Sequence, residues 1–221
     1  MMHRVHILER CFMKNTLTGN SNLVSAHYFD VPPLDPLSLL KEWVDTAVLL
    51  KLSEPMSLVL STINVSNKPS SRVVLLKEID TTGVIFCSNE SSQKIRDSHS
   101  NPYVSGTLWW RETIQQINFS GSLKKLPENV SDRLFNERTI EAQAVSAASS
   151  QSSLMINENE LKTIINQLIQ QNKNIERPKT WNAYHIHIES IEFWLGHTTR
   201  LSKRLRYDLS NDSWSYKKLQ P

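Results

Sequence analysis

The chain is poor in cysteine and glycine. It has two cysteines, Cys11 and Cys87, in 221 residues. Two cysteines cannot build a disulfide framework, and these two are not spaced as Cys-x-x-Cys metal ligands. The five glycines form neither a nucleotide-binding loop nor a Gly-x-Ser-x-Gly nucleophile elbow, and a His-Glu-x-x-His helix is also absent. Because no acid, base or nucleophile stands out, we expect a bound cofactor to carry any reaction, and we predict no metal site.

Long apolar runs and strong charge blocks are missing as well. No run approaches the roughly 20 residues that a membrane span needs, and charges interrupt what would be the apolar core of a signal peptide in the first dozen residues. Lysine and arginine number 25 against 22 acidic residues, and the net charge of +3 is spread along the chain. This distribution argues against nucleic acid as a partner. Together with the few cysteines, it predicts a cytoplasmic protein with no membrane partner.

The order of the expected elements predicts a mainly β, α+β fold. Residues 1–28 lack periodicity and are expected to form a flexible tail, and 29–221 suit a single domain. Asp35-Pro36 begins a helix over 35–50, a short helix follows Ser91, and helices are expected over 127–172 with a polar break at 149–153. An antiparallel split barrel with packed helices is the predicted architecture. The strands are expected at 56–64, 70–79, 83–88, 103–110, 112–121, 182–196, 202–209 and 214–220.

A four-residue apolar run with a base at each end spans Arg72 to Lys77. Side chains alternate faces along a strand, so the two bases should point to opposite sides of the sheet. One strand could then serve two sites. The alternative is that the two bases simply keep the ends of a buried strand in water.

Three further segments suggest a bound anion or ring system. Residues 88–94, SNESSQK, lie at a strand-to-helix junction, where backbone N–H groups, hydroxyls and an ammonium could converge on an anion, although a serine-rich helix cap is the simpler reading. The polar segment 149–153 is equally consistent with a plain loop. Residues 192–204 mix aromatic side chains with bases and could enclose a planar anion, but surface strands also carry such bases. His185 and His187 share a strand face without a third ligand nearby, which favours a structural role.

Taken in order, these blocks resemble the pyridoxine 5′-phosphate oxidase family of FMN-binding split β-barrels, and within it the phenazine-biosynthesis branch. The blocks are RVVLLK (72–77), SNESSQK (88–94), NP (101–102), Gln116, SSQSS (149–153), EFW (192–194) and RLSKR (200–204). The resemblance implies a homodimer with two FMN sites at the subunit interface. It assigns cofactor contacts to Arg72, Val73, Val74, Leu75, Leu76, Lys77, Cys87, Ser88, Gln93, Lys94, Gln116, Gln151, Ser152, Trp194 and Arg204.

The substrate side departs from the pyridoxine enzymes. The family's phosphate-binding Tyr and Ser fall on Leu134 and Ala142, and its His falls on Ser202. Each lost hydrogen bond to a charged phosphate is worth roughly 1.5–3 kcal/mol. The substrate-binding positions that the resemblance implies are Lys77, Leu134, Arg138, Ala142, Arg200 and Ser202.

A larger, flatter substrate with fewer charges suits these changes, because Leu134 and Ala142 would offer apolar surface and room. We therefore expect an FMN-dependent oxidase that aromatises a partly reduced phenazine carboxylic acid, with dioxygen as the final electron acceptor and no certain catalytic side chain. The alternatives are a pyridoxine/pyridoxamine 5′-phosphate oxidase and a non-catalytic flavin-binding protein of the same fold.

Overall fold

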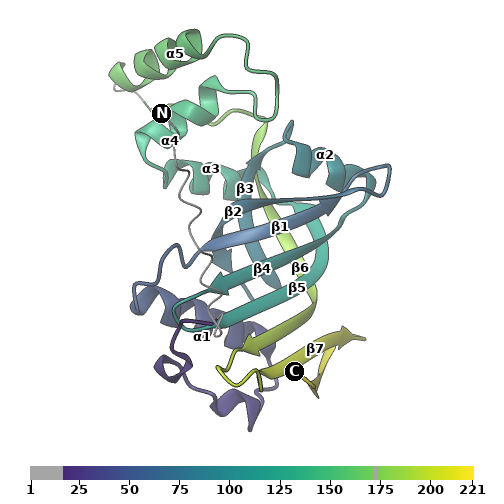
Figure 1. Ribbon diagram of the computed structural model, residues 1–221. Coiled ribbons are helices and arrows are strands. Elements are labelled where there is room, and N and C mark those ends of the chain that lie inside the picture. Colours follow the sequence, from purple (N-terminus) through teal and green to yellow (C-terminus); the bar gives the residue numbers. More distant parts are fainter. Residues whose placement is uncertain (1–16, 172–173) are drawn as a thin grey trace, which may run out of the picture.

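The computed structural model describes residues 17–171 and 174–221. Its eight antiparallel strands follow the order β3-β2-β1-β4-β5-β6-β7-β8, and β3 also pairs with β6. Strands β1 to β6 therefore close into a barrel, which β7 and β8 extend on one side (Figure 1). This confirms the predicted antiparallel barrel. The strands are β1 Ser57–Ile63, β2 Pro69–Ile79, β3 Gly83–Asn89, β4 Tyr103–Trp110, β5 Gln115–Lys125, β6 Trp181–Leu195, β7 Lys203–Ser210 and β8 Ser213–Leu219.

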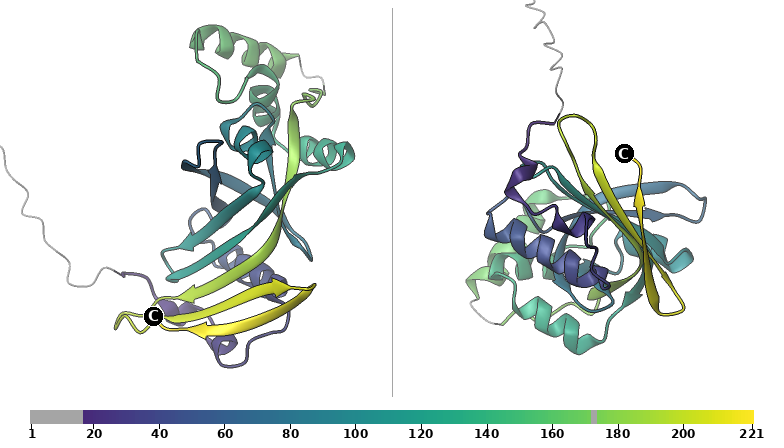
Figure 2. Two further views of the ribbon diagram at one scale, coloured as in Figure 1. Left: turned by 90° about the vertical axis from the view of Figure 1, so that its right-hand side faces the viewer. Right: turned by 90° about the horizontal axis from the view of Figure 1, so that it is seen from below.

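The long strand β6 splits the sheet. Its first half, Trp181–His187, pairs with β3, whereas its second half, Ser190–Leu195, pairs with β7. Its other edge pairs with β5, where the register shifts between Ser120 and Gly121. A Cβ on Gly121 would lie 1.8 Å from the carbonyl oxygen of His187, so only glycine permits this approach. As a result, β7 and β8 leave the barrel and stand beside it (Figure 2).

Helix α1, Pro36–Leu49, packs its apolar face against the barrel core. Asp35 caps the helix by accepting hydrogen bonds from the backbone N–H groups of the first turn, at 3.0 and 3.2 Å. Trp43 lies edge-on to Phe193 of β6, with ring centroids 5.2 Å apart. Burial of this face joins α1 to the core cluster that fills the barrel.

The remaining helices gather near the other end of the barrel (Figure 1). Helix α2, Gln93–Ser100, follows β3, and the chain between β5 and β6 forms α3, Glu128–Asn136, α4, Ile140–Ala148, and α5, Glu158–Gln170. Phe135 of α3 lies edge-on to Trp181, in a second small apolar cluster. Helix α5 has no buried residue. No helix in the described part of the chain is long and apolar enough to cross a membrane.

Two boundaries differ from the expectations. Strand β5 begins at Gln115 and not at 112, because the preceding residues form a turn in which Ile114 has a φ of 56°. Within the expected tail, residues 17–28 contact the domain: Val24 and Tyr28 pack against the core, and the Asn20 N–H donates to the Glu112 carbonyl at 2.7 Å. The expectations for residues 1–16, which include Cys11, lie outside the described residues.

Candidate functional site

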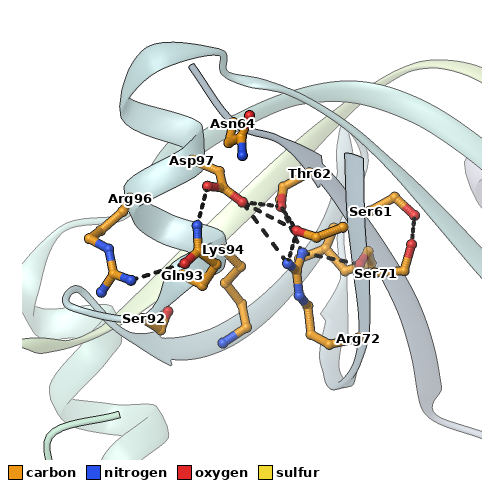
Figure 3. Close-up of polar contacts among 12 residues, drawn as sticks. Ser61, Thr62, Asn64, Ser71, Arg72, Ser92, Gln93, Lys94, Arg96 and Asp97 are labelled. Carbon is orange, nitrogen blue, oxygen red and sulfur yellow. Dashed lines mark hydrogen bonds and ion pairs between the residues drawn. The ribbon is translucent and has the colours of Figure 1, made fainter. Parts of the chain in front are cut away.

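The two cations Arg72 and Lys94 meet between β2 and the first turn of α2 (Figure 3). The Arg72 Nη1 donates to Thr62 Oγ1 at 2.7 Å, and Nη2 donates to Ser70 Oγ at 2.5 Å. Burial lowers the pKa of the Arg72 guanidinium, and the nearby Asp97 carboxylate opposes this shift. The guanidinium is thus anchored on one side by β1 and β2 and still lines a cavity.

Lys94 is buried, with 6 % of its surface exposed. Its Nζ donates to Ser88 Oγ at 3.2 Å. Burial, and secondly the positive charge of Arg72, lower the pKa of Lys94 to about 8. The ammonium form therefore lacks full electrostatic compensation in the protein alone, and a bound anion would supply it.

The polar segment 149–153 folds back over the start of α2. Ser152, with a φ of 69°, accepts a hydrogen bond from the Gln93 N–H at 3.2 Å, whereas the N-cap residue Ser92 makes no side-chain capping bond. The Gln151 side-chain oxygen accepts from Ser88 Oγ at 3.3 Å. The segment therefore contacts the start of α2 and lines a cavity. The cavity measures about 390 Å³ and is lined by Arg72, Val73, Val74, Leu75, Cys87, Gln93, Lys94, Gln151 and Ser152.

A second cavity of about 260 Å³ adjoins the first and shares Cys87 and Gln151 with it. The Arg138 guanidinium lies over the Trp181 ring, 5.0 Å from the centroid, and burial lowers its pKa. Burial raises the pKa of the Cys87 thiol to about 12, against the nearby positive charges of Lys77 and Arg138. Lys77 of β2 therefore lies near Cys87, at the bulge where the register between β2 and β3 shifts. The lining residues are Cys87, Ser88, Asn89, Arg138, Val145, Ser146, Ser149, Gln151 and Trp181.

The other predicted site residues on and beside β5, β6 and β7 lie away from the first two cavities. Gln116 of β5 pairs with Trp194 of β6, which pairs with Arg204 of β7. The Arg204 guanidinium forms a two-pronged ion pair with Glu192, at 2.7 and 3.1 Å, which raises the pKa of Arg204. Ser202 and Arg204 line a third cavity of about 270 Å³. Strand β7 and helix α2 lie toward opposite ends of the molecule (Figures 1 and 2). Arg200 precedes β7, with a φ of 68°.

Leu76, Leu134 and Ala142 line none of the three cavities. Leu76 and Leu134 are each only 2 % exposed, because they pack in the two apolar clusters. The contact between Leu134 and a substrate stays a prediction. Ala142 lies in the first turn of α4, where its N–H donates to Thr139 Oγ1 at 3.3 Å.

Sequence reasoning also missed residues that the fold brings to the site. Asp97 lies one turn after Gln93 and accepts its side-chain N–H at 2.7 Å. Val145 and Ser146 line the second cavity. The i,i+4 spacing of Gln93 and Asp97 was the available signal for the first contact. His185, in contrast, contacts Asp80 at 3.1 Å, and no cluster of metal-ligating side chains occurs in 17–171 or 174–221.

The fold is a split antiparallel barrel in which the half-buried Arg72 and the buried Lys94 lie beside the N-terminus of α2. Residues 45–172 match the family model described as pyridoxamine 5′-phosphate oxidase. Residues 181–221 match the pyridoxine 5′-phosphate oxidase C-terminal dimerisation region. The chain belongs to the pyridoxamine 5′-phosphate oxidase family, which confirms the resemblance seen in the sequence.

Named relatives fall into two groups. The dihydrophenazinedicarboxylate synthase of Pseudomonas chlororaphis is 35% identical over 95% of this chain and 94% of its own length. A pyridoxine/pyridoxamine 5′-phosphate oxidase of Legionella pneumophila is 34% identical over 85% of this chain and 88% of its own. The crystal structure of PhzG from Burkholderia lata in complex with tetrahydrophenazine-1-carboxylic acid is 36% identical, covers 90% of this chain and 98% of that one, and superposes with a TM-score of 0.87.

Proposed function

We propose that this protein is an FMN-dependent oxidase of phenazine biosynthesis. It removes a hydride and a proton from a partly reduced tricyclic phenazine carboxylic acid, and dioxygen takes the two electrons to give hydrogen peroxide. The observation that carries the proposal is the similarity to PhzG across nearly the whole chain. The Arg138 guanidinium supports it, because it lines the second cavity, next to the cavity that Arg72 and Lys94 line. The ring becomes aromatic in the reaction, so positioning alone contributes much of the catalysis and no strong general base is required.

The residues of the first cavity fit FMN. Arg72 offers a planar fork and Lys94 a point charge to the phosphate, and the Ser152 hydroxyl and the start of α2 lie beside them. The low pKa of Lys94 marks a cation that a phosphate dianion would stabilise. When bound, FMN would supply the two-electron acceptor that the side chains lack. The protein's own part is to bind, orient and exclude water.

The residues of the second cavity fit an aromatic acid. Arg138 can pair with a carboxylate, and Trp181 beneath it adds apolar surface. The buried Leu134 and the methyl group of Ala142 replace two donors to a phosphate, which favours a carboxylate over a phosphorylated vitamin. The retained Lys77 and Arg138 and the 34% identical relative from Legionella favour the second candidate, a pyridoxine/pyridoxamine 5′-phosphate oxidase.

We also propose that two copies form each site. The outer face of β1, β2 and β4 exposes Val59, Val73, Leu75 and Trp109, an apolar surface suited to a subunit interface. The matched dimerisation region contains Trp194, Arg200, Ser202 and Arg204. In such a dimer, the cavities of one copy are completed by residues of the other copy, namely Gln116, Trp194, Arg200, Ser202 and Arg204.

The test of the dimer uses two inactive variants. Arg72→Ala alters one group of residues and Trp194→Ala the other. Mixed dimers, purified with two affinity tags, should recover about half the wild-type activity, because each holds one intact site. If each chain formed its own site, the mixed dimers would stay inactive. A monomer by light scattering that held FMN would also contradict the proposal.

The test of the reaction is anaerobic mixing. The purified protein should show a flavin spectrum, and reduced phenazine-1-carboxylic acid should bleach it. Bleaching by pyridoxine 5′-phosphate alone would favour the second candidate, and bleaching by neither would leave a flavin-binding protein without oxidase activity.

A further inference from the structure

Asp97 is a buried carboxylate beside the cation pair, with 3 % of its surface exposed. It lies on the face of α2 that covers the ends of β1 and β2. Its Oδ2 accepts a hydrogen bond from Thr62 Oγ1 at 2.7 Å and one from Ser70 Oγ at 3.4 Å, and its Oδ1 accepts from Gln93 Nε2 at 2.7 Å. The distance from its Oδ2 to Arg72 Nη2 is 4.0 Å, which is too long for a direct hydrogen bond.

The two hydroxyls connect Asp97 to Arg72. A hydroxyl has one hydrogen and two lone pairs, and an ionised carboxylate only accepts. When Thr62 and Ser70 give their hydrogens to Asp97, their lone pairs are left for the Arg72 N–H groups, which lie 2.7 and 2.5 Å from the two oxygens. The carboxylate therefore sets the direction of both hydroxyls, and the hydroxyls set the plane of the guanidinium (Figure 3).

This arrangement leaves part of the Arg72 guanidinium available to bind a ligand. Arg72 Nη1 also donates to the Leu60 carbonyl at 3.4 Å, so its contacts to described residues use three of the five N–H donors of a guanidinium. The other two N–H groups are available to a ligand in the cavity that Arg72 lines. An arginine held in this way is preorganised for a two-pronged contact with an anion.

We propose that Asp97 is a positioning residue for the cofactor phosphate site, acting through Thr62 and Ser70 to orient Arg72. The inference rests on the proposed FMN site and deepens it. Asp97 itself does not line the cavity, so its role is to hold Arg72 and not to touch the ligand. Gln93 keeps the second carboxylate oxygen occupied and thereby fixes the rotation of the Asp97 side chain.

The test compares Asp97→Asn with Asp97→Ala. Both remove the same negative charge, but only Asn keeps a carbonyl oxygen that accepts from the two hydroxyls. The apo-proteins are titrated with FMN and with riboflavin, which lacks the phosphate, by quenching of flavin fluorescence. We expect FMN to bind Asp97→Ala about fivefold to tenfold more weakly than Asp97→Asn, the effect of about one hydrogen bond. Riboflavin should bind the two variants equally.

Thr62→Val provides a second measurement, because valine has the shape of threonine without the hydroxyl and leaves Asp97 in place. It should weaken FMN binding by a similar factor and leave riboflavin binding unchanged. Equal FMN affinities for the Ala and Asn variants, or an equal loss for both flavins, would overturn the role of Asp97. A wild-type protein that bound riboflavin and FMN equally would instead overturn the proposed phosphate site.

Discussion

Replacing Lys94 with methionine should make the apo-protein more stable and its cofactor binding weaker. The pKa of Lys94 falls from the ordinary 10.5 to about 8 because the ammonium is buried and faces Arg72. At about 1.4 kcal/mol per tenfold change in the protonation equilibrium, the penalty for burying the charge is about 3 kcal/mol at neutral pH. Water in the open cavity screens the charge, so we expect Lys94→Met to raise the free energy of unfolding by about 1–2 kcal/mol at pH 7.

The pH dependence of the stability difference tests whether the buried charge of Lys94 is its cause. Because the folded-state pKa of Lys94 lies below that of the unfolded chain, folding penalises the charged form fully below about pH 8. The penalty fades as the pH rises from about 8 toward 10.5, so the advantage of the methionine variant should shrink over this range. FMN needs the charged form, so its affinity for the wild type should fall above about pH 8, whereas riboflavin affinity should not.

The assays are urea unfolding of the apo-protein and flavin titration, each at several pH values between 7 and 10. Lys94→Met should bind FMN about ten- to a hundredfold more weakly, the effect of one charged hydrogen bond. Lys68→Met, at an exposed position, is the matched control and should change neither quantity. An apo-protein of Lys94→Met that is no more stable than the wild type at pH 7, or an FMN affinity that is flat across pH 8 to 10, would refute the reasoning.

Three further predictions concern the second cavity and the barrel. Arg138→Leu should lower kcat/KM for a reduced phenazine acid by about ten- to a hundredfold in anaerobic flavin-reduction kinetics, because it removes a charged hydrogen bond to the substrate. The affinity for FMN should stay within about threefold of the wild type. An unchanged kcat/KM would show that Arg138 does not bind the substrate. Val145→Phe should fill part of the same cavity and raise the KM for the reduced phenazine acid. Val48→Phe, at an exposed position on α1, is the control and should leave this KM unchanged. Gly121→Ala should lower the free energy of unfolding by about 2 kcal/mol in urea, because its Cβ would meet the His187 carbonyl 1.8 Å away, whereas the adjacent Ser122→Ala adds no atom and should cost less.

Much of the first cavity was predictable from the sequence. All nine of its lining residues were among the expected cofactor contacts. They were recognisable because they come in short contiguous blocks, 72–75, 87–94 and 151–152, whose order along the chain resembles that of the family. Residues of the second cavity on α4, such as Val145 and Ser146, carry no such pattern, since their side chains look like those of any helix surface.

The strand order along the chain, the helix that Asp35 caps and the blocks of cationic and polar residues were predictable from the sequence, because alternation, caps and local motifs depend on neighbours a few residues apart. Which of these blocks come together depends on the tertiary fold. It separated Arg72 and Lys94 from Trp194 and Arg204, buried Leu134, and placed Asp97 against two hydroxyls of β1 and β2. These relations depend on the register of strands far apart in the chain and on how β6 divides its pairing between β3 and β7, which no local pattern encodes.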